Sequence, residues 1–572
     1  MNWNSRSLDP RWVKSRVQLQ ERYAEVSRLP DASRLAYLWG PSTVVTEEQI
    51  RDLWAEAIAN PVFDGESSNN VYIHVPFCKS LCSFCNYERL RPSNPALLEA
   101  WLERVIRSMK TIGPVVSQLQ WGSVYIGGGT PSTLPSSMLR RLFEALEEHI
   151  NIRPDAHKSF EFDPLVMSAG RVKALADHGF SHFSFGIQTL DPEVNKAHNR
   201  GFQNRDTVAK RFEELYAAGL YDVACDFLFG LAGTSPETIL DDIEWVLSEY
   251  TPGNVDVFQI SPTPEYVDQH FGGSLDAFWA HLEPFQKIAK PGLESMAKRH
   301  GYTVNVEGGH RYTLRRVALP KFFKEVPRSC YSYNQLVAEA GRPMHLLGFG
   351  PSARSQVFGY AHYRCRDPGD QVLTDAPAVY EGNRITLSEE VRTYLVHQLR
   401  DNNHVDRKRF AQIFEKDVTD VVPVALSAWD ADGLLTIDDR TVSLPAQTRR
   451  ERLLSLMWLV PEPHLEHEIA RRQRLDLTPD GILRLTGELE PGQLLAAQHR
   501  YGGVDRNGRI VIHTPNRLKV LFRVAPGLKE GSPLRLILES KPPSAKDERD
   551  GITRAMVQVR RVLRAGAEQV RA

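Results

Sequence analysis

The sequence predicts an α/β protein whose main domain is an open, partial (β/α)6 barrel of the TIM type. From Asn70 onward, short apolar segments alternate with longer helical ones, which is typical of successive βα units around a parallel sheet. Six such units are well marked, fewer than the eight that close a barrel. The chain of 572 residues has 25% charged and 42% hydrophobic residues, which are ordinary values for a folded protein of several domains.

Each predicted unit pairs a short strand with a helix. The predicted strands are 71–75, 123–126, 159–162, 182–186, 222–228 and 256–261, with weaker candidates at 302–306 and 346–349. The predicted helices are 95–110, 137–149, 169–178, 205–218 and 236–249. These units place the barrel domain at 61–365.

Three further segments flank the barrel. Residues 1–60 form a polar, helical N-terminal extension in which Thr46 opens a capping box. Residues 366–475 form a helical, winged-helix-like module, and residues 476–572 form a small α+β domain of unknown role. The module's predicted elements are helices at 387–399, 407–414 and 418–429 and a hairpin at 433–444. In the last domain we predict strands at 509–513, 518–524 and 534–538, followed by an arginine-rich helix.

Charge and hydropathy exclude several partners. Lys and Arg total 70 against 71 for Asp and Glu, so no overall field favours nucleic acid or anionic lipid, and the acids of the winged-helix-like module favour packing over DNA binding. The longest apolar stretch, 453–460, is far shorter than the roughly 20 residues that span a bilayer. Residues 1–14 lack the apolar core of a secretory signal. We therefore expect a cytoplasmic protein that binds neither membrane nor nucleic acid.

Polar and glycine residues follow the predicted strands at their carboxyl ends, where parallel βα folds gather functional groups. The first strand leads to a cysteine cluster, and the second leads to Gly-Gly-Gly-Thr-Pro at 127–131. The later strand ends carry Glu161, Asp163, Gly186, Gln188, Asp226 and Gly230. The sequence therefore predicts a ligand site at this end of the sheet.

Cys78, Cys82 and Cys85 have CxxxCxxC spacing on a loop that leaves a strand. Three thiolates on one loop can hold three irons of a [4Fe-4S] cluster and leave the fourth iron open to a ligand. Structural zinc is the alternative, but it takes four protein ligands, usually as two pairs, and no second pair accompanies this one. The remaining cysteines, Cys225, Cys330 and Cys365, are predicted to be small buried residues.

These residues carry a family resemblance. The segment 72–78 with Cys82, Phe84 and Cys85, the glycine motif, and Glu-Phe-Asp-Pro at 161–164 resemble the radical S-adenosylmethionine (SAM) superfamily. Within it, the match is to the branch of oxygen-independent coproporphyrinogen III oxidase, the related heme chaperones and the class C radical methyltransferases. The resemblance covers about residues 60–470 and is strongest up to Gly230.

The resemblance implies a [4Fe-4S] cluster whose open iron binds SAM, reductive cleavage of that SAM to a 5′-deoxyadenosyl radical, and a second SAM molecule beside the first. Tyr72, Gly128 and Glu161 resemble contacts to the first SAM molecule. The residues that resemble surroundings of the second are Phe84, Gly129, Thr130, Gln188, Arg200, Asp226 and Ser261. The residue types suit these roles, because glycine admits close approach, a carboxylate binds an ammonium or hydroxyl, and arginine forks onto a carboxylate. A tight turn for the glycines and a surface ion pair for Arg200 are the structural alternatives.

Departures from the relatives guide the functional prediction. Tyr87 stands where the porphyrinogen oxidases carry a further cysteine, residues 1–60 lack their tyrosine-rich arm, and the chain continues well beyond the heme chaperones. We therefore predict a radical C-methyltransferase or cyclopropane-forming enzyme acting on a small natural-product-type substrate. Oxidative decarboxylation of a porphyrinogen ranks second, and a heme-binding carrier ranks third. A flavodoxin or ferredoxin is the expected reductant, and a monomer is the expected state.

Overall fold

The computed structural model describes most of the chain up to Arg474 and three later strands. The described residues are 10–26, 32–39, 42–63, 68–85, 87, 89–92, 94–307, 311–317, 343–365, 378–474, 509–513, 519–524 and 536–539. They form two compact units, one of Met1–Arg16, Pro30–Ser261 and Ala280–Pro461, the other of Val17–Leu29, Pro262–Trp279 and Glu462–Ala572. The division into four domains predicted from the sequence stays a prediction.

A large sheet forms the centre of the first unit, and its middle strands are the predicted parallel ones. These strands are β2 (Ser68–Val75), β3 (Trp121–Gly128), β4 (Ile152–Phe162), β5 (His182–Gln188), β6 (Asp222–Phe229) and β7 (Asn254–Gln259). They lie in chain order, each parallel to its neighbour, and β10 (Met344–Phe349) joins β2 in parallel. Antiparallel strands lie at both ends of the strand order. Within the described residues these end strands do not pair with each other, so the sheet is open. The predicted α/β fold with an open parallel sheet is confirmed.

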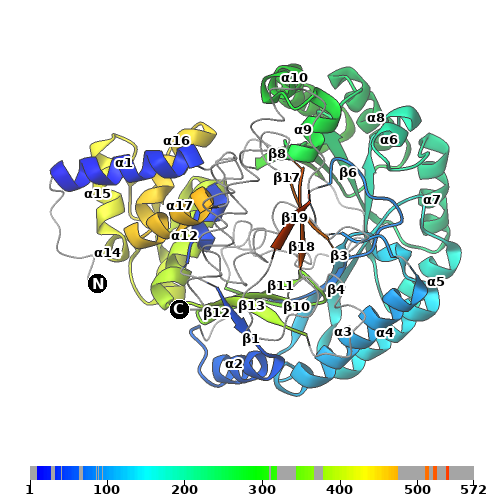
Figure 1. Cartoon of the computed structure of the whole chain (residues 1–572), viewed down its shortest axis with the longest axis horizontal. Coiled ribbons are helices and arrows are strands. Elements are labelled where there is room, and N and C mark those ends of the chain that lie inside the picture. The colour runs from blue at the N-terminus through cyan, green and yellow to red at the C-terminus, as the bar shows by residue number, and fades with distance from the viewer. Residues whose placement is uncertain are drawn as a thin grey trace. The chain divides into compact units, whose positions relative to one another are not determined.

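Helices connect the parallel strands and cover one face of the sheet. They are α3 (Pro95–Val116), α4 (Ser136–His149), α5 (Ala169–Asp177), α6 (Pro192–Ala197), α7 (Arg205–Ala217) and α8 (Pro236–Glu249), with the short η3 (Pro131–Thr133). Figure 1 shows α3, α4, α5, α7 and α8 following one another along the outer side of the curved sheet. Apolar strand residues such as Ile126, Phe160 and Phe183 are fully buried. The hydrophobic effect therefore holds these helices to the sheet.

The opposite face carries a row of polar side chains across neighbouring strands. We call this row the polar band; it comprises Tyr72, Tyr125, Glu161, Ser184, Asp226 and Asp256. Strand register brings its members together, since Glu161 pairs with Ser184 and Asp226 pairs with Asp256. This face leads to the predicted ligand site.

Antiparallel strands extend the sheet at both sides. Beyond β10 lie β11 (Arg354–Val357), β12 (Ala361–Cys365), β13 (Tyr380–Arg384) and finally β1 (Thr43–Val45). Beyond β7 lie β9 (Arg311–Arg316) and β8 (Tyr302–Glu307). The weak candidate at 302–306 is therefore a strand, but it belongs to an antiparallel hairpin and not to a βα unit. The sheet also continues past residue 365, where the predicted barrel domain ends.

Helices make up most of the remaining elements. Near the start are α1 (Pro10–Val26), η2 (Ala32–Tyr37) and α2 (Glu47–Ala59), whose predicted capping box at Thr46 is present. The winged-helix-like region contains α12 (Leu387–Asn402), β14 (His404–Asp406), α13 (Arg407–Phe414), α14 (Val418–Val421), α15 (Pro423–Ala431), β15 (Thr436–Ile437), β16 (Thr441–Ser443), α16 (Arg449–Leu456), η5 (Met457–Leu459) and α17 (Glu462–Arg474). The single helix predicted at 418–429 is wrong, because Pro423 starts a new helix there.

Two helices that the sequence did not mark are α9 (Pro264–Phe271) and α10 (Leu275–His300). Near the end of the chain, β17 (Arg509–His513), β18 (Lys519–Val524) and β19 (Leu536–Glu539) lie in the segments where strands were predicted, and they form an antiparallel sheet. The predicted arginine-rich helix lies outside the described residues. No helix among the described residues is both long and apolar enough to span a bilayer.

Candidate active site

The cysteine loop leaves the carboxyl end of β2 and is held at both ends by backbone hydrogen bonds. The Leu90 N–H donates to the Pro76 carbonyl at 2.6 Å, and the Cys78 N–H donates to the Leu90 carbonyl at 3.0 Å. Arg89 donates to the Cys82 carbonyl at 2.8 Å. The loop is therefore closed at its base.

The thiols of Cys78 and Cys82 sit in surroundings that disfavour a bare thiolate. Burial raises the pKa of Cys78 to about 12, although Thr130 Oγ1 donates to its sulfur at 3.5 Å. Burial also raises the pKa of Cys82, which the nearby Arg200 guanidinium partly opposes. Thiolates are the form that binds iron, so a cationic group is needed to hold these sulfurs in the ligand state. Iron of a cluster would meet that need.

The spacing of the sulfurs disfavours a single metal ion. Among the described residues, the one group of three potential ligand atoms lying within 4.8 Å of one another is formed by His157, His182 and Asp222, and not by the cysteines. In a cubane cluster each thiolate binds a different iron, so its sulfurs stand farther apart than the ligands of one ion. The loop therefore fits a cluster better than zinc.

The glycine loop after β3 packs directly against the cysteine loop. The Gly129 N–H donates to the Val75 carbonyl at 2.8 Å, and the Thr130 N–H donates to the Phe77 carbonyl at 2.7 Å. A Cβ on Gly129 would lie 2.8 Å from the Phe77 carbonyl oxygen and 3.0 Å from Cys78 Sγ. Glycine is therefore required here for close approach of the two loops. A tight turn alone does not explain why position 129 is a glycine.

Glu161 receives hydrogen bonds from the neighbouring strand β3. The Gly128 N–H donates to Oε2 at 3.1 Å, from a backbone with φ of 116° that favours glycine, and the Tyr125 hydroxyl donates to Oε1. Burial raises the pKa of Glu161, and these two hydrogen bonds oppose the rise. On the adjacent β2, the Tyr72 hydroxyl lies 2.8 Å from Nδ1 of His74. The carboxylate is thus oriented at the strand end where the resemblance places SAM.

Arg200 and Gln188 meet where β5 ends. Gln188 has a left-handed backbone with φ of 70°, and the pairing of β5 with β6 shifts register between Gly186 and Gln188. Non-glycine residues hold this conformation at a cost, and such strain is common at ligand sites. A Cβ on Gly186 would meet both Gln188 Nε2 at 3.0 Å and Arg200 Nη2 at 3.3 Å. The register shift therefore brings the two side chains together.

The guanidinium of Arg200 faces the cysteine loop. It donates to the Gly186 carbonyl, lies 3.7 Å from Asp163 Oδ2 and lies 4.0 Å from Cys82 Sγ. Its side chain is only 8% exposed, so the alternative of a surface ion pair is wrong. Nε of Arg200 is buried and has no hydrogen-bond partner among the residues that the structure describes. An unpartnered buried donor beside the cysteines fits a site that takes a ligand carboxylate.

Asp226 lies in the polar band, deeper along the sheet. Burial raises the pKa of Asp226 to about 8, and the nearby Asp256 and Glu161 add to the rise. The Ser184 hydroxyl donates to Asp226 Oδ2 at 2.9 Å. Asp256 is itself compensated by Arg311 at 2.8 Å. At neutral pH the band therefore includes a carboxyl group that holds its proton.

Phe84 and Ser261 occupy the remaining predicted positions. The Phe84 ring lies 5.9 Å from the His198 ring, and Nδ1 of His198 lies 2.8 Å from Ser83 Oγ. His198 therefore supports the cysteine loop from the segment after α6. Ser261 lies beyond the end of β7, and no hydrogen bond described for the chain joins its side chain to the other predicted residues.

The structure thus gathers most of the predicted residues into two adjoining groups. The first surrounds the cysteines and contains Gly129, Thr130, Gln188 and Arg200. The second surrounds Glu161 and contains Tyr72, Gly128 and Asp226. Sequence reasoning missed Tyr125, Ser184, Asp256 and His198. Their polar character within apolar strands was a signal for the first three, whereas His198 contacts the loop only through the fold.

Comparison with known proteins agrees with this geometry. Residues 72–246 match the family model of the radical SAM superfamily. The heme chaperone HemW of Bacillus subtilis is 23% identical over 66% of this chain and 95% of its own length. The oxygen-independent coproporphyrinogen III oxidase of Escherichia coli is 24% identical over 66% of this chain and 82% of its own length. The solved structure of that oxidase superposes with a TM-score of 0.58, at 20% identity, covering 72% of this chain and 94% of that one.

The matched segment begins at Tyr72 in β2 and ends at Val246 in α8. It contains the cysteine loop and the glycine loop, and every predicted site residue except Ser261 lies inside it. Residues 72–246 are a radical SAM domain, and the similarity of the chain to the oxygen-independent coproporphyrinogen III oxidases and the related heme chaperones supports that branch of the superfamily.

Proposed function

We propose that this protein cleaves SAM reductively and uses the resulting radical to abstract a hydrogen atom from a carboxylate side chain of a reduced tetrapyrrole. The side chain then loses carbon dioxide and passes one electron to a one-electron acceptor, which completes an oxidative decarboxylation. The observation that carries the first part is the convergence of the cysteine loop, the glycine loop and the buried Arg200 at the carboxyl ends of β2, β3 and β5. The substrate class rests on the relatives.

The residues present fit the two groups that this chemistry needs. Cys78, Cys82 and Cys85 would hold a [4Fe-4S] cluster, which supplies one electron to the sulfonium of SAM when both are bound. Arg200 offers its free Nε–H to a carboxylate, and Glu161 offers oxygen acceptors to an ammonium or a ribose hydroxyl. A radical must be kept away from water, and Cys78 and Arg200 are each only 7% exposed in this region.

The tetrapyrrole assignment departs from the main prediction made from the sequence. The coproporphyrinogen III oxidase of Escherichia coli matches over 82% of its length, and its fold matches over 94%. The sequence similarity supports decarboxylation, which ranked second among the predictions, whereas methyl or methylene transfer has no comparable support. The polar band adds a physical argument, because its carboxyl groups can accept hydrogen bonds from pyrrole N–H groups.

Heme carriage is the second candidate function. The heme chaperone of Bacillus subtilis matches over 95% of its length. Tyr87, which is 55% exposed, stands where a further cysteine is expected in the oxidases. A heme carrier would keep the cysteine loop but would not catalyse decarboxylation.

A second SAM molecule and an electron donor are also part of this proposal. The second SAM molecule would lie beside the first, among Phe84 of the cysteine loop, Thr130 and Arg200, which contact cysteine sulfurs, and Gln188 next to Arg200. A flavodoxin or ferredoxin would deliver the electron to a monomeric enzyme.

Product analysis tests the proposal. The full chain, loaded anaerobically with iron and sulfide, is given dithionite, SAM and coproporphyrinogen III. We expect 5′-deoxyadenosine and carbon dioxide without S-adenosylhomocysteine. Formation of S-adenosylhomocysteine with 5′-deoxyadenosine would instead establish methyl transfer, and tight heme binding with neither product would establish the carrier.

A further inference from the structure

A second cluster of metal-binding side chains lies away from the cysteines. His157 on β4, His182 at the start of β5 and Asp222 at the start of β6 meet on three neighbouring strands. Strand register brings them together, since His182 pairs directly with Asp222. Gln188, at the other end of β5, lies six positions after His182, a distance of about 20 Å along a strand. The cluster is therefore separate from the candidate active site.

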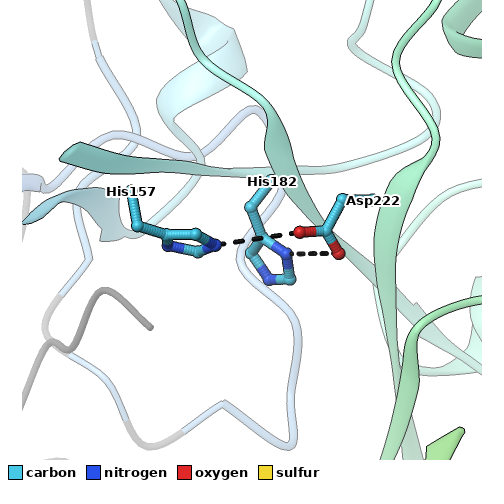
Figure 2. Close-up of side chains that lie close together, drawn as sticks. All are labelled: His157, His182 and Asp222. Atoms are coloured by element: carbon cyan, nitrogen blue, oxygen red, sulfur yellow. Dashed lines mark ion pairs between the residues drawn. The ribbon is translucent and has the colours of Figure 1, made fainter. Parts of the chain in front are cut away.

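We propose that His157, His182 and Asp222 bind a divalent cation of the zinc class. Figure 2 shows both imidazole rings directed toward the carboxylate of Asp222. His182 Nδ1 lies 3.0 Å from Asp222 Oδ1, and His157 Nε2 lies 3.7 Å from Asp222 Oδ2. Zinc binds such ligands at about 2.0–2.2 Å in tetrahedral geometry, which places them about 3.4 Å from one another. The two distances lie on either side of that value.

The hydrogen-bonding pattern favours a cation over a simple ion pair. Although His182 Nδ1 is buried and lies 3.0 Å from Asp222 Oδ1, the two atoms are not aligned as a regular hydrogen bond, and Nδ1 has no other hydrogen-bond partner among the described residues. If His182 Nδ1 and an Asp222 oxygen both bound one ion, the two atoms would lie close together, but each would be directed at the ion and not at the other atom. His157 Nδ1 lies 3.3 Å from Ser159 Oγ, a contact typical of the second nitrogen of a metal-bound histidine.

Burial and charge also suit a cation. The side chains of His157, His182 and Asp222 are 4%, 12% and 17% exposed, so few waters compete for the ligand atoms. Three protein ligands leave a fourth position for water. Because the ligands come from three adjacent strands, the ion would fasten β4 to the amino ends of β5 and β6.

Zinc uptake by the full, cluster-loaded chain tests this site. After anaerobic incubation with Zn²⁺ and desalting, we expect one zinc per chain, and zinc should raise the melting temperature. His182→Gln should weaken zinc binding at least 10-fold in a chelator competition while the iron content stays unchanged. His178→Gln serves as the matched control, because His178 is a part-buried histidine that pairs with Glu147 outside the trio.

Asp222→Asn provides a second variant, which should also lose zinc while retaining iron. Equal zinc uptake by the original chain and by His182→Gln would overturn the proposal. So would the absence of zinc from the original chain. A melting temperature that both substitutions lower equally with and without zinc would show an ion-pair network in place of a metal site.

Discussion

Arg200 combines a buried positive charge with an unused donor. Its guanidinium contacts the Gly186 carbonyl, the Asp163 carboxylate and the sulfur of Cys82, while Nε has no partner within the described part of the chain. A buried charge is stable only when its surroundings compensate it, and here the Asp163 carboxylate does so. The residue is therefore positioned both to balance the cysteine loop and to bind an anionic ligand group.

Arg200→Ala should impair product formation more than cluster assembly. Loss of a charge-assisted hydrogen bond costs about 1.5–3 kcal/mol, which corresponds to roughly a 10- to 100-fold loss in the rate of 5′-deoxyadenosine formation. Gln188→Ala should act in the same direction. Iron content and product formation are measured on the same preparation.

Lys196→Ala is the matched control, since Lys196 is an exposed cation on the neighbouring α6 with a side chain 72% exposed. It should leave both readouts unchanged. Loss of iron in the Arg200 or Gln188 variant would contradict the ligand-binding role and assign these residues to the cluster loop itself.

Asp226 makes stability depend on pH in a defined direction. Its pKa of about 8 in the folded state exceeds the ordinary value near 4, because burial disfavours the charged form. Between these values the unfolded chain has lost the proton that the folded chain keeps, so stability is full below about pH 4 and falls as the pH rises to about 8. Between about pH 5.5 and 8, the free energy of unfolding should therefore decrease by about 2–3 kcal/mol less in Asp226→Asn than in the original chain.

Urea unfolding at several pH values measures this effect. Asp155→Asn, which changes an exposed carboxylate on β4, should preserve the pH dependence of the original chain. An unchanged slope in Asp226→Asn would mean that Asp226 is ionised in the folded protein.

Single residues of the site could be predicted only where they belong to a local motif. Cys78, Gly129 and Glu161 follow strands in recognisable patterns. Tyr125 and Ser184 lie inside strands, and their importance depends on which face of the sheet they occupy and on what the next strand places beside them. That information is absent from local spacing.

At the scale of elements, two loops determine the geometry of the site. The glycine loop and the cysteine loop share hydrogen bonds from Gly129 and Thr130 to carbonyl groups of β2 and its exit. Backbone atoms line the gap between the two loops, so neither loop can move away from the other without displacing the strand that precedes it.

Gly129→Ala should therefore reduce cluster loading. The new methyl group would lie 2.8 Å from a backbone oxygen and 3.0 Å from Cys78 Sγ, and relief of such overlap costs about 1–3 kcal/mol. We expect a several-fold lower iron content per chain at similar helical content by circular dichroism. Gly170→Ala is the control, because its nearest neighbour would be Ser136 Oγ at 3.7 Å, an ordinary contact. Full iron loading of Gly129→Ala would show that the loops adjust freely.

The βα alternation predicted most elements of the parallel sheet. The helices and strands that it did not predict correctly have local causes. Helix α10 contains Pro284 and Pro291, which interrupt the pattern expected of a continuous helix. Pro423 divides the helix predicted at 418–429. Strand β1 has only three residues, too few to show a period.

At the scale of the whole molecule, distant parts of the chain are joined by buried polar contacts. Arg16 is 2% exposed and donates to the Val460 carbonyl at 2.5 Å and to the Met457 carbonyl at 2.6 Å. Its guanidinium also lies 5.7 Å from the Trp458 ring. These contacts tie the N-terminal segment to the end of the helical region.

Arg16→Ala should lower the free energy of unfolding by about 3 kcal/mol, because two buried carbonyl groups lose a charged donor. Thermal or urea unfolding of the full chain measures the loss. Lys14→Ala, a change at an exposed position on the same helix, should have little effect. Equal stability of the two variants would show that water replaces the guanidinium.

The overall architecture was predictable only in part. Alternation of strands and helices indicates an open parallel sheet, but it contains no information on how the sheet ends. The antiparallel strands at its two sides pair with segments far away in sequence, as β1 does with β13. Such pairing depends on the assembled fold.

The pairing of β1 with β13 also bears on how the protein is made. Thr43 and Gly382, which share a hydrogen bond, are separated by 339 positions. During synthesis the β1 segment leaves the ribosome long before its partner exists, so this border of the sheet closes late and exposes unpaired backbone in the meantime. Nascent chains stalled before residue 380 should therefore need a holding chaperone, whereas chains released after residue 384 should not.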